Sequence, residues 1–268
     1  MLLLVILATR PTLVPWRTLS TRERGLLGLT AIAQAALSLS VFAAYDVMAV
    51  ALVLAVYLSY PLLVSMASIA LGRERMTLVR GVALLTASAG LTAVVLGGVD
   101  AGVGALSIGG LVLAGVAAAC QATYVVASRA GFSRVPSEQA TVLILAGAAA
   151  LMWLVALPSE VVSGTPASWA GSPTAWIAIV IAGVLGAAVA KVWMLRGVRR
   201  VGGTRASVLM LSEPVTGVIL AGLLLGQSMS VVQVVGGVGV LAGALLAQRP
   251  AGGRDPSVPA LELHLARA

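Results

Sequence analysis

The chain has 268 residues, of which 60% are hydrophobic and only 10% are charged, and its formal net charge is +8. A soluble domain averages roughly 45–50% apolar and about 25% charged residues, so a single aqueous core could not hide this much apolar surface. With a mean hydropathy of +1.06, the composition excludes an ordinary soluble domain and indicates a protein whose solvent is lipid.

Metal, disulfide and cofactor chemistry find little support in the composition. The one cysteine, Cys120, has no second cysteine with which to form an internal disulfide. The one histidine, His264, leaves no cluster of metal ligands. No nucleophile–base pair or phosphate-binding loop is evident, so we expect no metal, no cofactor and no enzyme activity. The start lacks the basic segment and cleavage site of a signal peptide.

Apolar stretches of about 20 residues, the length that crosses a bilayer as a helix, recur along the chain between charged or turn-rich breaks. Residues 1–8 are apolar but too short to cross alone, and residues 249–268 read as a disordered tail. We predict an all-α polytopic membrane protein with about eight full spans and a partial one. The full spans are predicted at 25–44, 47–71, 77–97, 107–129, 137–157, 174–195, 204–224 and about 230–247.

Along the chain, loops that contain arginines alternate with loops that contain none. The arginines gather before the first full span, at 73–80, at 129–134, at 196–205 and in the tail. The intervening loops carry a lone acidic residue or no charge. By the positive-inside rule, the arginine-rich loops and the C-terminal tail lie in the cytoplasm.

This distribution also bears on partners and location. Because the bases belong to several short loops rather than to one patch, we do not expect a nucleic-acid partner. Sixteen arginines against one lysine are typical of a GC-rich bacterial genome, so the predicted location is a bacterial inner membrane. The expected partners are the lipid bilayer and a small-molecule substrate.

Two stretches of the chain repeat each other, "YLSYPLLVSMASIALGRERMT" and "MLSEPVTGVILAGLLLGQSMS". Pro61 and Pro214 are 153 positions apart, and so are Gly90 and Gly243. A constant offset through two helices and a turn indicates an internal repeat. The first copy has a basic loop where the second has the uncharged "GQS", so the copies have opposite orientations. Inverted repeats build many secondary transporters, with the site at the repeat interface near the bilayer midplane.

The offset defines two repeats and a tail. Residues 1–98 form the first repeat, residues 104–248 the second, and residues 249–268 the tail. The first repeat lacks one span and most of another. Two explanations stay open: the true start lies upstream, or the chain is a shortened paralogue. We favour the first, because residues 1–8 resemble the end of a helix that has been cut.

The order of these motifs resembles the EamA-like branch of the drug/metabolite transporter superfamily. The segment "LRGVRRVGGTRASVLMLSEPVTGVILAGLLLGQSMSVVQVVGGVGVLAGALL" is similar to the last helix pair of that family, and "YPLLVSMASIALGRERMT" to its first-repeat counterpart. The resemblance implies an inverted repeat of five transmembrane helices each, and transport of small metabolites or drugs, often export. The chain departs from the family pattern at Gln227 and Lys191.

Glu213 and Pro214 are the strongest candidates for a functional site. Glu213 is the only carboxylate near mid-membrane, where an acid costs roughly 2.5–3.5 kcal/mol and needs a partner or a proton. It could bind substrate, carry a proton, or simply hold a helix end by accepting hydrogen bonds. Pro214 and Pro61 each remove a backbone donor and free a carbonyl, that of Tyr57 in the first repeat. Such breaks line a transporter cavity or are kinks that serve packing.

Other polar residues inside the spans are weaker candidates. Lys191 either snorkels to the interface or pairs with Glu213 or an anionic substrate. The remaining polar candidates line a path or bond a neighbouring helix. They are Gln34, Gln121 and Tyr124, together with Tyr60, which stands where Glu213 does in the second repeat. Gly239 and Gly243 predict close helix packing, within the fold or in a homodimer.

The predicted function is a secondary transporter, an exporter of small metabolites or drugs that works by alternating access, with protons as a candidate driving ion. Two alternatives stay open. One is a shortened, non-transporting paralogue that serves as a membrane partner subunit. The other is a subunit of a lipid or polyprenyl-carrier flippase.

Overall fold

The computed structural model describes residues 13–72, 77–97, 107–132, 134–163, 172–181, 183, 188–225 and 230–248. All regular structure in these ranges is helical, which confirms the predicted all-α class. The predicted partial span 1–8, the departure at Gln227 and the tail 249–268 lie outside the described residues.

Five segments of the described chain are long and apolar enough to cross a membrane, which confirms a multi-pass architecture. They coincide with the first five full spans predicted from the sequence. A short 3₁₀ helix, η1 (Trp16–Thr18), precedes them. The five crossing segments lie in α2 (Thr21–Val47), in α3 (Val50–Tyr57) continued by α4 (Tyr60–Ala70), in α5 (Leu78–Leu96), in α6 (Ile108–Ala130) and in α7 (Ser137–Ser163).

The long helices begin at residues suited to that position. The Ser20 hydroxyl accepts from the Glu23 amide, and the Glu23 carboxylate accepts from the Ser20 amide, which together form a capping box at α2. Thr77 and Ser107 cap α5 and α6 with their side-chain oxygens. Each cap pairs a backbone donor that the first turn would otherwise leave free.

The second half of the chain is divided into shorter helices. The predicted span 174–195 contains α8 (Pro173–Ile181) and the start of α9 (Ala190–Val201). The predicted span 204–224 contains α10 (Gly203–Met210) and most of α11 (Ser212–Leu225). Gly202, at φ 90°, forms the sharp turn between α9 and α10 that only glycine adopts readily. The last helix, α12 (Val231–Gln248), covers the predicted eighth span and is a shorter apolar helix than the five crossing segments.

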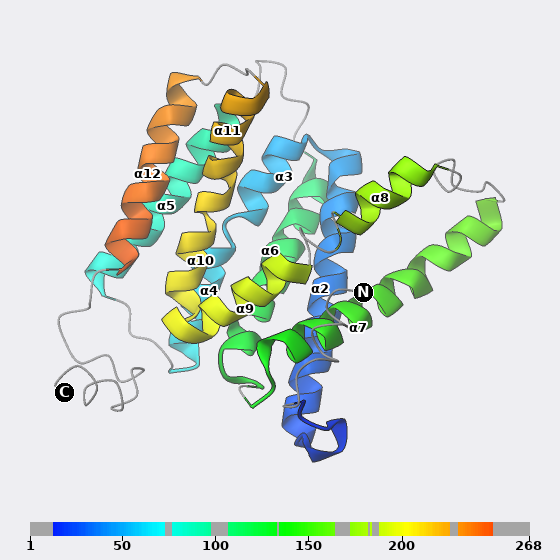
Figure 1. Ribbon diagram of the computed structural model, residues 1–268. Coiled ribbons are helices and arrows are strands. Elements are labelled where there is room, and N and C mark those ends of the chain that lie inside the picture. The colour runs from blue at the N-terminus through cyan, green and yellow to red at the C-terminus, as the bar shows by residue number, and fades with distance from the viewer. Residues whose placement is uncertain are drawn as a thin grey trace.

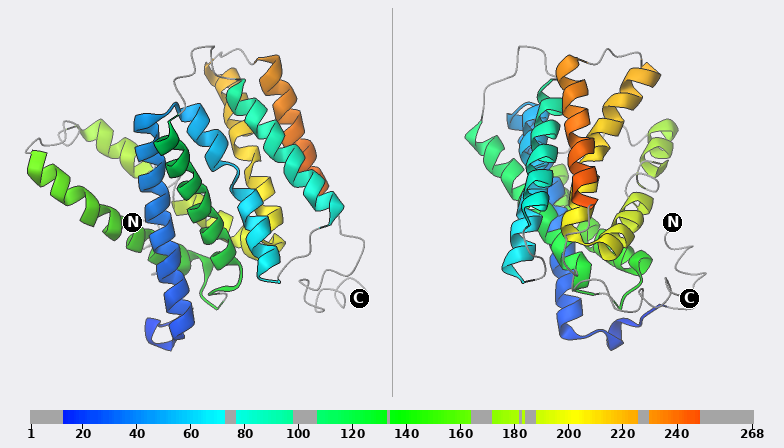
Figure 2. Two further views of the ribbon diagram at one scale, coloured as in Figure 1. Left: turned by 180° about the vertical axis from the view of Figure 1, so that it is seen from behind. Right: turned by 90° about the vertical axis from the view of Figure 1, so that its left-hand side faces the viewer.

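Helices α5 and α12 lie side by side in opposite directions, as Figures 1 and 2 show. Glycine permits this close approach. A Cβ built on Gly90 would lie 2.6 Å from the Gly236 carbonyl oxygen, and one on Gly243 would lie 2.7 Å from that of Ala83. Gly239 also contacts Gly90. The two glycines predicted for packing therefore face α5 inside this chain.

The largest group of buried side chains joins α4, α5, α6 and α10, and includes Val64, Leu84, Val125 and Val208. Large apolar side chains also cover the outer faces, where Leu223 is 77% and Leu85 is 65% exposed. A soluble protein would not leave so many such side chains in water, so these faces contact lipid.

Candidate transport site

The span formed by α3 and α4 is interrupted at Leu58 and Ser59. Helix α3 ends at Tyr57, and α4 starts at Tyr60 with Pro61 in its first turn. The Ser59 hydroxyl donates to the Val56 carbonyl oxygen at 2.7 Å. Proline is tolerated in a first turn because the amide there has no intrahelical partner.

The pair of helices α10 and α11 is interrupted in the same way. Leu211 separates the two helices, and Pro214 stands in the first turn of α11. The Ser212 hydroxyl donates to the Leu209 carbonyl oxygen, also at 2.7 Å. Each interruption therefore consists of a serine that bonds back to the ending helix and a proline that opens the next one.

A cavity of about 600 Å³ lies between the two interruptions. Three of its four walls come from the helices α3–α4, α9 and α10–α11, and the fourth comes from Gln121 of α6. The lining residues are Leu54, Tyr57, Leu58, Tyr60, Gln121, Ala190, Lys191, Met194, Met210, Glu213 and Pro214. The lining is mainly apolar with a few polar groups, as is typical of small-molecule sites.

The cavity carries one positive and one negative side chain, Lys191 and Glu213. Within the described part of the chain, no ion pair joins the two. The ammonium group of Lys191 instead lies 4.6 Å from the centroid of the Tyr124 ring, a cation–π distance. Both charges therefore remain available to a molecule in the cavity.

Two tyrosines form a wall of the cavity. The rings of Tyr57 and Tyr60 have centroids 5.8 Å apart. The Tyr60 hydroxyl lies 3.4 Å from the Ser207 carbonyl oxygen and donates to it, which links the first interruption to α10. Buried tyrosines that hold one partner in this way supply apolar area and a fixed orientation.

An ion pair and several hydrogen bonds connect the arginine-rich end of α9 to the turn between α6 and α7 and to the start of α7. Arg196 pairs with the carboxylate of Glu138. Arg199 donates to the carbonyl oxygens of Val135 at 2.7 Å and Phe132 at 3.2 Å. It also donates to the Ser137 hydroxyl at 3.2 Å. These contacts lie about one to two turns beyond Lys191 along α9, so they join α9 to the α6–α7 turn at the end to which α9 leads.

The comparisons with known proteins decide the family. The sequence model of the EamA-like transporter family matches residues 108–248. The chain belongs to the EamA-like transporter family. This confirms the expected family, whose members are typically transporters rather than enzymes.

A second comparison concerns solved structures. One crystal structure of a protein resembles this EamA-like chain with a TM-score of 0.70 and 26% sequence identity. The match covers 88% of this chain and 77% of that chain. The comparison with curated proteins finds no match.

Six of the nine polar and proline candidates come together in the EamA-like protein. All six line the cavity: Glu213, Pro214, Tyr57, Tyr60, Gln121 and Lys191. Pro61 lies beside them in the first turn of α4 but does not line the cavity. Tyr124 is 1% exposed and reaches the cavity only through Lys191.

Gln34 lies apart from the cavity in α2. Its side-chain oxygen is buried and has no hydrogen-bond partner among the described residues. The side-chain oxygen of Gln121 is equally unpartnered, but Gln121 lines the cavity. A buried, unpaired oxygen calls for a water or ligand partner, and the cavity offers that partner to Gln121.

Sequence reasoning missed the two serines of the interruptions and five apolar lining residues, Leu54, Leu58, Ala190, Met194 and Met210. A signal for the serines was present, because "LSYP" and "LSEP" share Leu, Ser and Pro at matching positions. The apolar residues carried no such signal, since they do not differ in type from their lipid-facing neighbours. The polar groups that line the cavity are the charges of Lys191 and Glu213, the amide of Gln121 and the hydroxyls of Tyr57 and Tyr60.

Proposed function

We propose that this EamA-like protein is a secondary transporter that exports a small metabolite or drug across the bacterial inner membrane by alternating access. The observation that carries the proposal is the cavity of about 600 Å³ between two interrupted helices, with Glu213 and Lys191 in its walls. Interrupted spans at the centre of a membrane protein are typical of substrate sites in transporters.

We further propose that the halves are inverted repeats. The bounds of the helices support this, because α10 starts 153 positions after α3, and α12 starts 153 positions after α5. The serine bonds give independent support. Ser59 to Val56 and Ser212 to Leu209 are equivalent under the same offset of 153 and have the same length of 2.7 Å. Two copies of one device are expected where two half-sites enclose a common ligand.

The charges of the cavity point to the class of substrate. A ligand with an ammonium group could face Glu213, and one with a carboxylate could face Lys191. A small amphoteric metabolite satisfies both and leaves neither charge unpaired in a low-dielectric site. The tyrosine pair would contact its apolar part.

The transport cycle requires the cavity to open to each side in turn. We place the arginine-rich end in the cytoplasm by the positive-inside rule. The contacts of Arg196 and Arg199 with the α6–α7 turn would then close the cytoplasmic side, and entry of substrate for export would require them to part. We propose Glu213 as the group that carries a proton in this cycle, since it is the acid that lines the cavity.

An efflux assay tests the proposal. Cells that express the protein are loaded with a panel of amphoteric metabolites and drugs, and loss of each compound is followed at several external pH values. We expect net efflux of at least one compound, which falls by about tenfold or more in Glu213→Gln because removing one charge contact costs over 1.4 kcal/mol. Asp46→Asn removes a similar charge near the end of α2, away from the cavity, and serves as the control.

The outcomes separate the rival functions. Normal efflux with unchanged pH dependence in Glu213→Gln would make Glu213 a structural residue. Absence of efflux for the whole panel, with a second membrane protein retained on purification, would favour a partner subunit. Altered lipid export without altered metabolite efflux would favour a flippase subunit.

A further inference from the structure

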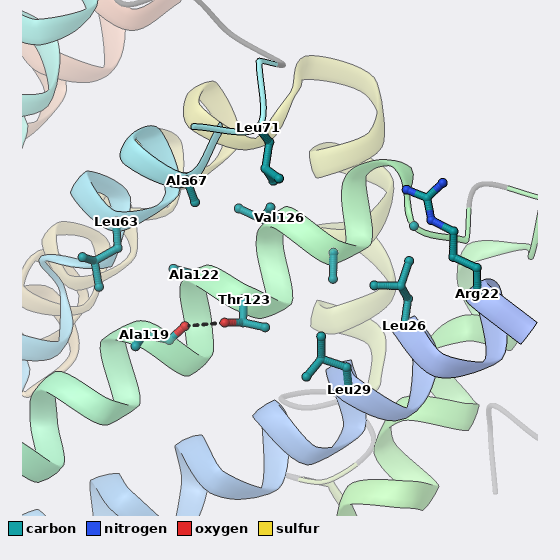
Figure 3. Close-up of a pocket in the computed structure, with 12 residues that line it drawn as sticks. Arg22, Leu26, Leu29, Leu63, Ala67, Leu71, Ala119, Ala122, Thr123 and Val126 are labelled. Atoms are coloured by element: carbon teal, nitrogen blue, oxygen red, sulfur yellow. Dashed lines mark hydrogen bonds between the residues drawn. The ribbon is translucent and has the colours of Figure 1, made fainter. Parts of the chain in front are cut away.

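A second hollow of about 530 Å³ lies between α2, α4 and α6 (Figure 3). It shares no residue with the transport cavity. Its floor is α6, one wall is α2 and the other is α4. The lining residues are Arg22, Leu26, Leu29, Leu63, Ala67, Leu71, Ala119, Ala122, Thr123, Val126, Ala127 and Gly131.

The hollow is a groove because its floor is built from small side chains. Ala119, Ala122 and Ala127 cannot fill the space between the larger leucines of α2 and α4. The groove runs along α6 from Ala119, in the middle of that helix, to Gly131 at its end. Such a shape suits a long, narrow, flexible occupant rather than a compact metabolite.

The walls offer that occupant only apolar contact over most of their length. The single hydroxyl among the lining side chains is that of Thr123, and it donates to the Ala119 carbonyl oxygen at 2.9 Å, as Figure 3 shows. Leu29 and Leu71 are exposed beside it. Because these spans lie in lipid, an apolar groove on their outer face is accessible to hydrocarbon chains.

The one charged residue of the groove, Arg22, stands at its arginine-rich end, in the first turn of α2. The neighbouring Glu23 does not neutralise it, because the Glu23 carboxylate accepts from the amide and the hydroxyl of Ser20. An exposed guanidinium at the membrane surface binds phosphate oxygens readily. The charge and the groove thus match the two parts of a phospholipid.

We propose that this groove is a binding site for an anionic phospholipid of the leaflet on the arginine-rich side. One acyl chain lies along the floor of α6 between Leu63 and Leu29, and the headgroup phosphate binds Arg22. The lipid holds α2 and α4 at fixed positions on α6, because it contacts all three helices at once. This site serves lipid recognition and is independent of the substrate carried by the cavity.

The first test uses native mass spectrometry of the purified full chain, exchanged into mixed micelles of phosphatidylglycerol and phosphatidylcholine. We expect one phosphatidylglycerol to remain bound in preference to phosphatidylcholine. Arg22→Ala reduces that preference about fivefold, since a basic residue near an anionic membrane surface contributes about 1 kcal/mol. Arg17→Ala, in the exposed η1 turn, removes the same charge outside the groove and keeps the preference. Equal losses in the two variants would reduce the effect to general surface charge and overturn the site.

The second test does not depend on a variant that folds. A phosphatidylglycerol with a photoreactive group midway along its acyl chain is incorporated into vesicles with the native protein, irradiated and mapped by peptide sequencing. We expect labels on the groove residues of α2, α4 and α6, such as Leu29, Leu63 and Thr123. Labels spread evenly over the exposed leucines would overturn the proposal. So would protein–protein cross-links through the groove, which would show a second copy as its occupant.

A filled groove provides the matched variant for this experiment. Ala119→Leu places a larger side chain on the floor, at an exposed position where a side chain contributes little packing to the folded chain. We expect it to abolish labelling in the groove while the thermal stability of the protein without lipid stays unchanged. Undiminished labelling in Ala119→Leu would contradict the assignment.

Discussion

The ammonium group of Lys191, a residue that lines the cavity, lies 4.6 Å from the centroid of the Tyr124 ring in α6. A lysine that snorkels would instead extend to the membrane surface. The ring is almost completely buried, so Lys191 is held inside the molecule by an aromatic face rather than by an acid.

This relationship predicts graded effects on transport. Lys191→Gln removes the positive charge and is expected to reduce efflux of an amphoteric substrate about tenfold or more, because a desolvated charge contact exceeds 1.4 kcal/mol. Tyr124→Phe keeps the ring and should transport nearly normally. Tyr124→Leu loses a cation–π attraction of about 0.5–1 kcal/mol and should lie between the two. Initial efflux rates at equal expression give the comparison, and equal rates in Tyr124→Phe and Tyr124→Leu would contradict a role for the ring.

The serines at the helix interruptions predict a matched pair of effects. Ser59→Ala and Ser212→Ala each remove one hydroxyl-to-carbonyl bond at the cavity. We expect each to lower thermal stability in detergent by about 0.5–1.5 kcal/mol, the net value of a hydrogen bond. Thr92→Ala removes a similar bond on an exposed face of α5 and is the control for transport. If the repeats are equivalent, both serine variants slow efflux and the control does not.

The contact between α5 and α12 predicts opposite effects of one substitution at two glycines of the same helix. Gly90→Ala places a methyl group 2.6 Å from the Gly236 carbonyl oxygen and 2.7 Å from the Val240 amide nitrogen, so the helices must separate. Overpacking of this kind costs about 1–3 kcal/mol. At Gly81 a Cβ meets nothing within 4 Å, so Gly81→Ala should stabilise the helix by about 0.5–1 kcal/mol. Thermal unfolding of both variants in one detergent checks the sign of each change.

The polar contacts at the end of α9 predict how the cavity is closed. Glu138→Gln weakens the pair with Arg196, and Arg199→Ala removes three hydrogen bonds to the α6–α7 turn. Both should increase access to the cavity from the arginine-rich side. Access is measured as the rate at which a membrane-impermeant maleimide, applied to that side, labels a cysteine placed at Ala190 in a Cys120→Ala background. An unchanged rate in both variants would show that this end does not gate the cavity.

The proposed orientation can be checked without any activity. A reporter that is active only in the cytoplasm, fused after Gln248, should be active, because the positive-inside rule places that end with the arginine-rich loops. Leu96 is the end of α5 that lies away from the arginine-rich loop before Leu78, so a reporter fused after Leu96 should lie outside the cytoplasm and be inactive. Activity in the second fusion and its absence in the first would reverse the direction that we propose for transport.

Several features could be predicted from the sequence because they depend on local composition. Apolar segments of bilayer length gave the first five spans, and the prolines gave the interruptions near Ser59 and Leu211. The intramembrane acid and lysine were recognised as candidates because a charge in lipid is costly wherever it stands. The family resemblance, which the family match over residues 108–248 confirms, predicted a transporter but did not identify its substrate.

The sequence by itself thus determined the lipid environment, the helical class and the residue types that a polar site must use. Which side chains meet was decided only by tertiary structure. From the sequence, Lys191 could extend to the membrane interface or pair with Glu213 or an anionic substrate. In the folded chain its ammonium group lies over the ring of Tyr124. Gln34 and Gln121 were equivalent as sequence, and only Gln121 lines the cavity. The physical reason is that burial cost is set by residue type, whereas the partner that offsets it comes from a helix distant along the chain.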